Sequence, residues 1–331
     1  MKHISELNKE ILIENKPNFV YERPKRYVAN IPLAFDIETT SITTESGEKF
    51  SNMYVWAFGL ADSVYYGRTW KEFTNFIALL SESWGLDEKK RNAIIYVHNL
   101  SYEFQFIRKL FSWSDVFAVD ERKPIRALTI QGIEFRDSYI LSGFSLLKTA
   151  ENLTKYEIEK LAGDLDYSLT RHNETPLTNE EWGYIRNDIL IIIYYIDEQI
   201  EQYGDIVGIP LTNTGRVREF TRDKCFKKEG KRDNNTKNKY HNLMLNLTLT
   251  VDDYKQLKRA FMGGFTHASN YHVGKIIDDV YSIDFTSSYP SVMVSEKFPM
   301  SKPIPIEVDS ISELEKLMID YNVLFDVKFT G

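Results

Sequence analysis

The chain has 331 residues, 43% of them hydrophobic and 14% aromatic, so it is long enough for two domains or one large one with a substantial core. Its formal net charge of −7 excludes a uniformly basic protein that coats nucleic acid. Cys225 is the only cysteine, which excludes internal disulfides and cysteine-rich zinc sites. The N-terminus lacks the apolar core of a signal peptide, and the longest apolar run, residues 189–196, is too short to span a bilayer. These features predict a cytoplasmic protein without a membrane partner.

Residues 1–30 are polar and predict an extended N-terminal lead-in. Between residues 31 and 205, short β-branched and aromatic runs alternate with amphipathic stretches, which predicts strands alternating with helices. The predicted strands are residues 32–38, 54–60, 93–98, 125–130 and 133–139. The predicted helices are residues 69–84 and 101–110 and a long one over 178–202, the first and last of which open with capping boxes formed by Thr69 with Glu72 and Thr178 with Glu181. The alternation predicts a mixed α/β sheet flanked by helices.

Four carboxylates fall within these predicted elements. Asp36 and Glu38 are two residues apart in one strand, so their side chains point to the same face. Glu103 lies in the helix that follows strand 93–98, and Asp188 follows Tyr184 by four residues, on the same helical face. Two divalent metal ions require hard oxygen ligands from several segments, and two ions about 4 Å apart can clamp both reacting oxygens of a phosphodiester. The set predicts a nuclease that uses two Mg²⁺ or Mn²⁺ ions.

The region over residues 206–247 differs in charge from the rest of the chain. Between Arg216 and Lys239, ten Lys and Arg residues accompany four acids, which gives this stretch a net charge of +6. We expect a basic linker here, with an exposed loop over residues 229–239. Such a stretch could follow DNA phosphates, and a solvated loop without a ligand explains it equally well.

Residues 248–331 read as the start of an α/β domain that is not completed. The expected elements are a helix over residues 252–261 and strands over 280–285 and 322–329. An incomplete domain of this kind would expose sheet edges and apolar surface.

The acidic motifs resemble the three exonuclease motifs of family B DNA polymerases, and most closely those of the protein-primed subgroup found in bacteriophages and linear plasmids. Residues 36–39 (Asp-Ile-Glu-Thr) match the first motif, residues 99–106 match the second, and Tyr184 with Asp188 matches the third. The resemblance implies a ribonuclease H-like (DnaQ-like) fold for residues 31–205 and a 3′–5′ exonuclease activity. The catalytic residues that it implies are Asp36, Glu38, Glu103, Tyr184 and Asp188. The four carboxylates would hold the metal ions, and Tyr184 would orient the attacking water.

Two positions depart from the family pattern. Glu103 stands where the family has aspartate, and the extra methylene moves its oxygen by about 1 Å, a displacement that can cost on the order of a hundredfold in rate. Ala162 stands where the family has a lysine that assists catalysis, and Lys160, two residues away, is a candidate substitute.

The resemblance also implies contacts with the 3′ end of single-stranded DNA. The residues at the matching positions are Thr39, His98, Asn99, Tyr102, Phe106, Ser145, Leu146 and Tyr167. Tyr102 and Phe106 could stack on bases, although Phe106 and His98 are equally consistent with core positions. Ser145-Leu146 resembles a motif that binds single strands and a terminal protein, which makes a terminal protein a candidate partner.

Two further motifs resemble the polymerase part of the family. Phe261, Gly263 and Gly264 resemble a Tyr-x-Gly-Gly motif that contacts single-stranded DNA, and residues 284–291 resemble polymerase motif A. In that motif Asp284 would bind a metal ion and Tyr289 would exclude ribonucleotides. The fingers, the second metal-binding aspartate and the thumb of the family do not follow. Residues 248–331 therefore predict a partial palm that does not polymerise, because one carboxylate does not make a two-metal site.

The sequence thus predicts the N-terminal part of a protein-primed DNA polymerase, encoded by a phage or plasmid in a bacterial host, which digests single-stranded DNA from the 3′ end. The alternative is a non-catalytic module of the same fold that binds DNA or terminal protein, with Glu103 and Ala162 as signs of decay. A ribonuclease of the same fold is a further alternative, and it leaves the motif A-like segment without a role.

Overall fold

The computed structural model describes residues 1–43, 46–161, 169–228, 230–261 and 266–326. The chain divides into two compact units, residues 1–221 and 222–331. In the described ranges, no helix combines the length and apolar character that a bilayer crossing needs.

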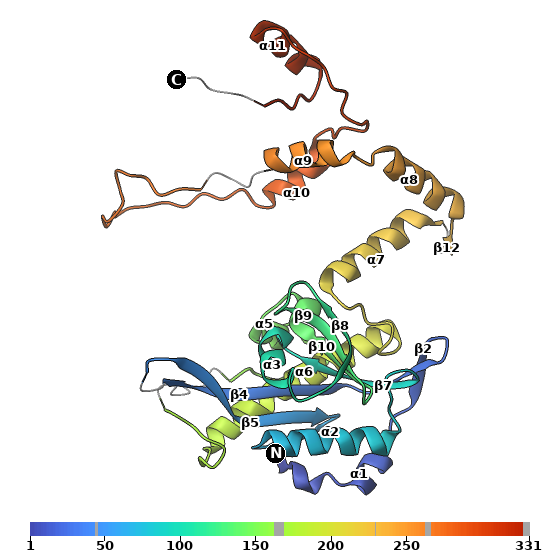
Figure 1. Cartoon of the computed structure of the whole chain (residues 1–331), viewed down its shortest axis with the longest axis vertical. Coiled ribbons are helices and arrows are strands. Elements are labelled where there is room, and N and C mark those ends of the chain that lie inside the picture. Colours follow the sequence, from blue (N-terminus) through green and yellow to red (C-terminus); the bar gives the residue numbers. More distant parts are fainter. Residues whose placement is uncertain (44–45, 162–168, 229, 262–265, 327–331) are drawn as a thin grey trace. The chain divides into compact units, whose positions relative to one another are not determined.

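A ten-stranded mixed sheet is the centre of the first unit (Figure 1). Its main path has the order β1-β6-β5-β4-β7-β10-β9-β8, and a hairpin of β2 and β3 joins it through β3, which pairs with β7. The strands are β1 (Lys2–His3), β2 (Phe19–Arg23), β3 (Arg26–Ala29), β4 (Leu33–Thr43), β5 (Lys49–Leu60), β6 (Ser63–Gly67), β7 (Arg91–Val97), β8 (Trp113–Ala118), β9 (Pro124–Thr129) and β10 (Ile133–Asp137). Strand β7 pairs in parallel with β3, β4 and β10, so the carboxyl ends of β7 and β10 lie at the same edge of the sheet.

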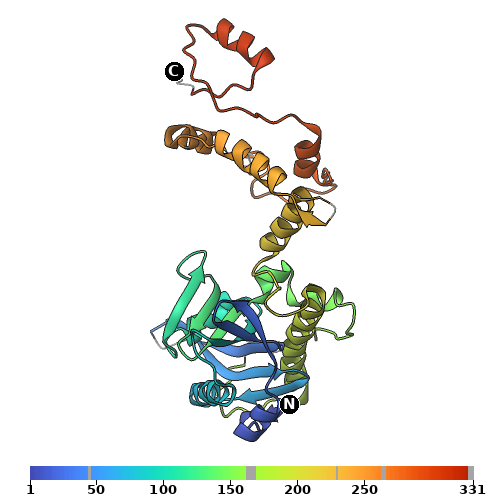
Figure 2. The same ribbon diagram turned by 90° about the vertical axis from the view of Figure 1, so that its right-hand side faces the viewer.

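Two helices cover opposite faces of this sheet (Figure 2). Phe35 of β4 belongs to the buried cluster that includes α2 (Trp70–Trp84), whereas its neighbour Ala34 belongs to the cluster that includes α6 (Asn179–Tyr203). The alternation of side chains along β4 therefore gives each face its own core. The shorter helices of this unit are η1 (Ile4–Glu6), α1 (Lys9–Glu14), α3 (Leu100–Ile107), α4 (Ser138–Ser142) and α5 (Leu146–Glu151), and α7 (Asn213–Phe226) begins in it.

The strands and helices predicted between residues 32 and 202 are present. Both predicted capping boxes form, at Thr69 with Glu72 and at Thr178 with Glu181. Gly85 ends α2 in the left-handed conformation with φ of 65°, which glycine adopts without steric penalty. Strand β4 is longer than predicted because its pairing with β5 continues to Thr43.

The prediction of an extended lead-in over residues 1–30 is wrong. This segment forms β1, η1, α1, β2 and β3, and Leu7 and Leu12 are 2% and 0% exposed in the α2 core. The indole Nε1 of Trp84 donates a hydrogen bond to the backbone oxygen of Leu12 at 2.7 Å. A few apolar side chains among polar neighbours are enough to dock a short helix when a large apolar surface is already present.

The second unit contains α8 (Asn234–Asn246), α9 (Val251–Ala260), α10 (Ser288–Ser295), α11 (Ile311–Asp320) and a short hairpin of β11 (Lys227–Lys228) and β12 (Lys231–Arg232). The expected loop over residues 229–239 is wrong in part, because α8 begins at Asn234 with Asp233 as its N-cap. The expected strand over residues 280–285 is also wrong, since these residues form neither a helix nor a strand. Of the expected strand over 322–329, residues 322–326 are not in a strand and the remainder lie outside the described residues.

Apolar side chains of the second unit are exposed. None of its described residues is buried, and Ile283 and Phe285 are 89% and 79% exposed. A stable strand needs a neighbouring strand to hydrogen-bond with, and its apolar face needs other residues to pack against it. The described residues of this unit provide neither for residues 280–285.

Leu12→Ala tests the contribution of the N-terminal segment to the fold. Because Leu12 is fully buried beneath α2, we expect the free energy of unfolding to fall by about 2–5 kcal/mol, as measured by urea denaturation. The adjacent Ile13 is 51% exposed, so Ile13→Ala is the matched control and should change stability by about 0.5 kcal/mol or less. Equal effects of the two substitutions would contradict a docked N-terminal segment.

Candidate active site

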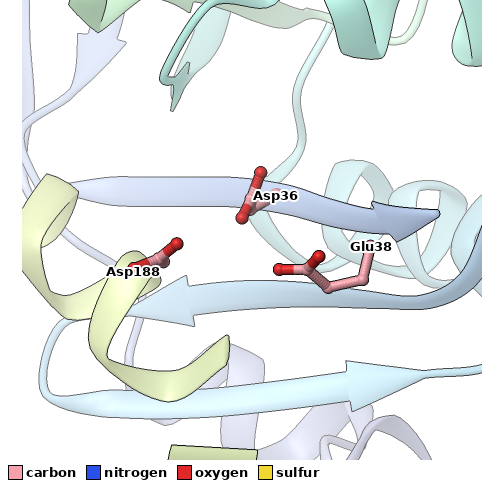
Figure 3. Close-up of side chains that lie close together, drawn as sticks. All are labelled: Asp36, Glu38 and Asp188. Carbon is pink, nitrogen blue, oxygen red and sulfur yellow. The ribbon is translucent and has the colours of Figure 1, made fainter. Parts of the chain in front are cut away.

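Three carboxylates meet on the face of the sheet that α6 covers (Figure 3). Asp36 and Glu38 come from alternate positions of β4, and Asp188 comes from α6, which crosses that face. One oxygen from each of the three lies within 4.8 Å of the others. A strand and a packed helix, both rigid elements, therefore hold three acidic groups from distant parts of the sequence at one point.

Burial raises the pKa values of these acids, and repulsion from neighbouring carboxylates adds to the rise at Asp36 and Glu38. Burial, followed by the charge of Asp188, raises the pKa of Asp36 to about 7. Burial, followed by the charges of Asp36 and Asp188, raises the pKa of Glu38 well above its usual value. A divalent cation between them would relieve this repulsion, and hard carboxylate oxygens are the ligands that Mg²⁺ and Mn²⁺ prefer. The donor set thus fits a divalent metal ion.

Lys160 and Tyr184 lie against the third carboxylate. The ammonium of Lys160 is 2.6 Å and 2.8 Å from the two oxygens of Asp188, and it donates to the hydroxyl of Tyr184 at 3.2 Å. It also lies 4.4 Å from the centre of the Tyr184 ring. Burial raises the pKa of Asp188, while Lys160 and the Tyr184 hydroxyl act in the opposite direction. The lysine considered as a substitute for the family's catalytic lysine is therefore in contact with the carboxylate cluster, and Ala162 lies outside the described residues.

Glu103 lies close to the cluster but is not one of the three acids that converge. It is on α3, 4% exposed, and its Oε2 has no hydrogen-bond partner among the described residues. Burial raises its pKa well above the usual value, and the charge of Asp36 is the next largest cause. Helix α3 begins after Asn99, whose φ of 75° places it in the left-handed region. The position of Glu103 thus depends on a tight strand-to-helix turn at the end of β7.

Asp137 is a further acid at this edge that the sequence analysis did not single out. It is 1% exposed at the end of β10 and caps α4, with Oδ1 accepting from the backbone N–H of Ile140 at 2.9 Å. Burial raises its pKa to about 6. Hydrogen bonds from backbone N–H groups, including those of Asn99 and Leu100, act in the opposite direction and lower the pKa. An aspartate near the end of the strand predicted over residues 133–139 was the available signal, because parallel β7 and β10 end at the same edge.

The residues expected to contact DNA near the carboxylates differ in exposure. The hydroxyl of Tyr102 is hydrogen-bonded to Thr39 Oγ1, and the side chain remains 39% exposed. Phe106 packs against the α2 core and stacks on Trp70 with ring centres 6.3 Å apart, which favours its core role. His98 Nδ1 lies 3.2 Å from Ser138 Oγ. Burial and Lys160 lower the pKa of His98 to about 4, so its imidazole is neutral at pH 7.

The remaining candidate residues from the sequence analysis lie on α5, in the second unit or outside the described residues. Ser145 is the exposed N-cap of α5, and the partly buried Leu146 is the first residue of that helix. Phe261 and Tyr289 belong to the second unit, with side chains 86% and 77% exposed, and Asp284 is exposed in the same unit. Tyr167, Gly263 and Gly264 lie outside the described residues.

Comparisons with known proteins identify related sequences. Residues 153–330, more than half of the chain, match the family model described as DNA polymerase type B, organellar and viral. The DNA polymerase of Bacillus phage B103 is 26% identical over 292 residues, which cover 81% of this chain and 45% of the relative. The DNA polymerase of Bacillus phage phi29 is 26% identical over 298 residues, 82% of this chain and 45% of the relative. The chain therefore spans about half the length of the curated relatives it matches.

A solved structure has the same fold. The phi29 DNA polymerase in its post-translocation complex with primer-template DNA aligns with a TM-score of 0.51 and 18% sequence identity, over 74% of this chain and 41% of that one. The alignment and the mixed sheet flanked by helices confirm the fold class predicted from the sequence.

The raised pKa of Asp36 predicts how stability depends on pH when metal is removed. The carboxyl of Asp36 keeps its proton up to about pH 7 in the folded protein, but only up to about pH 4 in the unfolded chain. Between these two pH values the folded state therefore binds more protons than the unfolded state. Stability in EDTA should therefore fall as the pH rises through this window. We expect the decrease in the free energy of unfolding between pH 5 and pH 8 to be smaller in Asp36→Asn than in the wild-type protein, by on the order of 2 kcal/mol. Urea denaturation at each pH measures it.

The exposed Asp62 supplies the matched control. Asp62→Asn should leave the pH profile of the wild-type protein unchanged. If Asp36→Asn and the wild-type protein gave parallel profiles, burial and the charge of Asp188 would not raise the pKa of Asp36.

Proposed function

This chain belongs to the type B DNA polymerases of organelles and viruses, and from that membership we propose that its first unit is a two-metal 3′–5′ exonuclease acting on single-stranded DNA ends. The convergence of Asp36, Glu38 and Asp188 carries this proposal. Burial raises the pKa values of all three acids, and repulsion from neighbouring carboxylates raises those of Asp36 and Glu38 further, so they form a site whose charge a divalent cation would balance.

In this proposal the three converging acids, with Glu103 beside them, hold two Mg²⁺ or Mn²⁺ ions. Bound there, the ions would supply an activated water and stabilise the leaving 3′ oxygen. The hydroxyl of Tyr184 accepts a hydrogen bond from Lys160 and bonds to Asp188, which fixes its orientation beside the cluster. Its oxygen keeps a further lone pair with which to orient the attacking water.

Lys160 supplies a positive charge at the edge of the carboxylate cluster. Its side chain is 22% exposed, so the Lys160 ammonium could contact a phosphate bound at the site without any unfolding. An ammonium held this close to the reacting centre stabilises negative charge that develops on the phosphate during cleavage. We propose that Lys160 thereby fills the role left open by Ala162.

The proposed substrate is the 3′ end of a DNA strand. The solved relative from phi29 holds primer-template DNA, which supports DNA as the polymer. The exposed ring of Tyr102 and the hydroxyl of Thr39 lie beside each other, and Thr39 directly follows Glu38 on β4. An exposed aromatic ring can stack on a base of any sequence, and such stacking suits a strand that is not paired.

For the second unit we propose the start of a polymerase palm, with Asp284 as a metal ligand and Tyr289 as the residue that selects the sugar. A terminal protein is a proposed partner, and the bacterial cytoplasm of a phage-infected or plasmid-bearing host is the proposed location. The phage DNA polymerases among the relatives support the last point.

A non-catalytic DNA-binding module of the same fold is the second candidate function. The observation that favours it is the position of Glu103, which is near the other acids but outside the group of three that converge. A protein of this kind would bind the DNA end and leave it intact.

Digestion of 3′-end single-stranded DNA distinguishes the two functions. We expect stepwise shortening with Mg²⁺ or Mn²⁺, and none in EDTA or with the Asp36→Ala/Glu38→Ala variant, because that variant lacks two of the three converging oxygen donors. An RNA strand of the same sequence tests for a ribonuclease. Binding of DNA without any shortening by the wild-type protein would identify the non-catalytic module, and Glu103→Asp would then show whether the longer side chain is the cause.

Lys160→Met tests the proposed role of the lysine in cleavage. We expect kcat to fall on the order of 10- to 100-fold, since the substitution keeps the length of the side chain and removes its charge beside Asp188. Lys155→Met is the matched control. Lys155 also forms an ion pair with α6, but its partner is the exposed Glu201 near the C-terminal end of that helix. Equal activities of the two variants would show that Lys160 only neutralises Asp188.

A further inference from the structure

A second charged site lies beside the β2–β3 hairpin of the first unit. A cavity of about 330 Å³ opens there. Its charged lining consists of Glu22, Arg23, Arg26, Arg126 and Arg136, and its apolar side comes from the segment over residues 207–211 that follows α6. We refer to it as the arginine cavity. None of its residues belongs to the carboxylate cluster.

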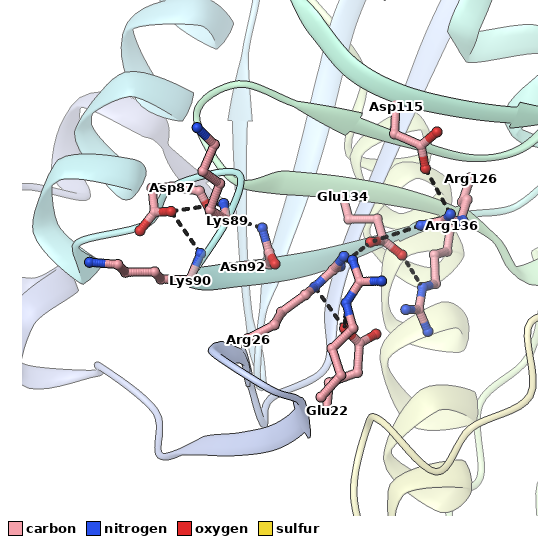
Figure 4. A network of polar contacts seen from close by, with 11 residues as sticks. Glu22, Arg26, Asp87, Lys89, Lys90, Asn92, Asp115, Arg126, Glu134 and Arg136 are labelled. Atoms are coloured by element: carbon pink, nitrogen blue, oxygen red, sulfur yellow. Dashed lines mark hydrogen bonds and ion pairs between the residues drawn. The ribbon is translucent and has the colours of Figure 1, made fainter.

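Three of the arginines converge on one buried carboxylate (Figure 4). Glu134 on β10 is 0% exposed. Its Oε2 lies 2.6 Å from Nη2 of Arg26, and its Oε1 lies 2.6 Å from Nε of Arg136. Nη1 of Arg126 is 3.7 Å from Oε2. One carboxylate thus serves three guanidinium groups from β3, β9 and β10.

The other acids at this site do not balance the arginines. Glu22 pairs with Nε of Arg26 at 2.7 Å and lies 3.7 Å from Nε of Arg23. Asp115 pairs with Nη2 of Arg126 at 2.7 Å. Four arginines therefore share three carboxylates, Glu22, Asp115 and Glu134, which leaves one positive charge in excess.

Two of the four arginines are held away from water. The side chains of Arg26 and Arg136 are 4% and 9% exposed. Each of these two has a carboxylate oxygen within 2.7 Å, as a buried charge requires. The positive charge in excess therefore falls on the more exposed Arg23 and Arg126.

The cavity has donors left for an anion. Arg126 is 29% exposed, and its ion pairs with Asp115 and Glu134 meet only two of its three nitrogens. Arg23 is 66% exposed at the same opening. Guanidinium groups present paired N–H donors that match the oxygens of a phosphate, and an apolar wall that excludes water strengthens such contacts.

We infer that the arginine cavity binds a phosphate group, supplied either by the backbone of a DNA strand or by a free nucleotide. The register of the sheet places this site on the α6 side. Paired residues on neighbouring strands point to the same face of a sheet. Arg136 of β10 pairs with Tyr96 of β7, which in turn pairs with Ala34 of β4, and both Tyr96 and Ala34 belong to the α6 core. The inference goes beyond the exonuclease proposal and does not rest on it, because it requires neither a metal ion nor cleavage.

Calorimetric titration of the full chain with inorganic phosphate tests the inference. The titration is done in EDTA, so that no metal ion at the carboxylate cluster contributes. We expect saturable binding by the wild-type protein and at least tenfold weaker binding by Arg126→Gln, which removes a donor group at the opening. Arg108→Gln is the matched control, since Arg108 is an exposed arginine at the end of α3, and it should bind as the wild-type protein does.

Arg23→Gln keeps the test decisive if Arg126→Gln fails to fold. Arg23 is mostly exposed and makes only the 3.7 Å contact with Glu22, so its substitution should leave the circular dichroism spectrum unchanged while it weakens phosphate binding several-fold. Absence of saturable binding by the wild-type protein would overturn the inference. So would equal affinities of wild-type protein, Arg23→Gln and Arg108→Gln.

The source of the phosphate is determined by two further ligands under the same conditions. A deoxynucleoside monophosphate and a short single-stranded oligonucleotide are each titrated into the wild-type protein and Arg23→Gln. A loss of affinity in the variant for the oligonucleotide alone assigns the site to a DNA strand, and a loss for the monophosphate assigns it to a free nucleotide. If neither ligand bound more weakly to the variant, the cavity would not be a phosphate site.

Discussion

The repulsion among Asp36, Glu38 and Asp188 is the constraint on which the arrangement of the first unit depends. Three carboxylates whose oxygens lie within 4.8 Å of one another are unfavourable unless the surrounding structure holds them there. Strand β4 lies inside the sheet between β5 and β7, and α6 is buried along much of its length against the same sheet. The two hydrophobic cores thus provide the stability that keeps the acids together.

Lys160 forms its ion pair with one of the three acids, and its charge also acts to lower the pKa values of the other two. Its ammonium contacts both oxygens of Asp188, whereas Asp36 and Glu38 retain pKa values raised by burial and by their neighbours. The protein therefore tolerates a partly uncompensated acidic site, which is common where a cation binds and uncommon where acids serve stability alone. The arginine cavity shows the opposite imbalance, in which four guanidinium groups share three carboxylates.

The two units differ in how their apolar residues are covered. In the first unit, strands and helices enclose two clusters of fully buried side chains. In the second unit, the described residues include none that is buried. Helices such as α9 and α11 form there because their caps and periodicity are local, while residues 280–285 have no partner strand among the described residues.

The sequence by itself determined the elements whose causes are local. Capping boxes at Thr69 and Thr178 and alternation along β4 depend on residues two to four positions apart, so they could be read without a structure. Only the tertiary structure decided which distant residues meet. It brought Lys160 to Asp188, 28 residues away, and Arg26 to Glu134, 108 residues away, and it folded the N-terminal segment against α2. Such contacts depend on strand register and helix packing, which no short pattern specifies, and for that reason the arginine cavity could not be predicted.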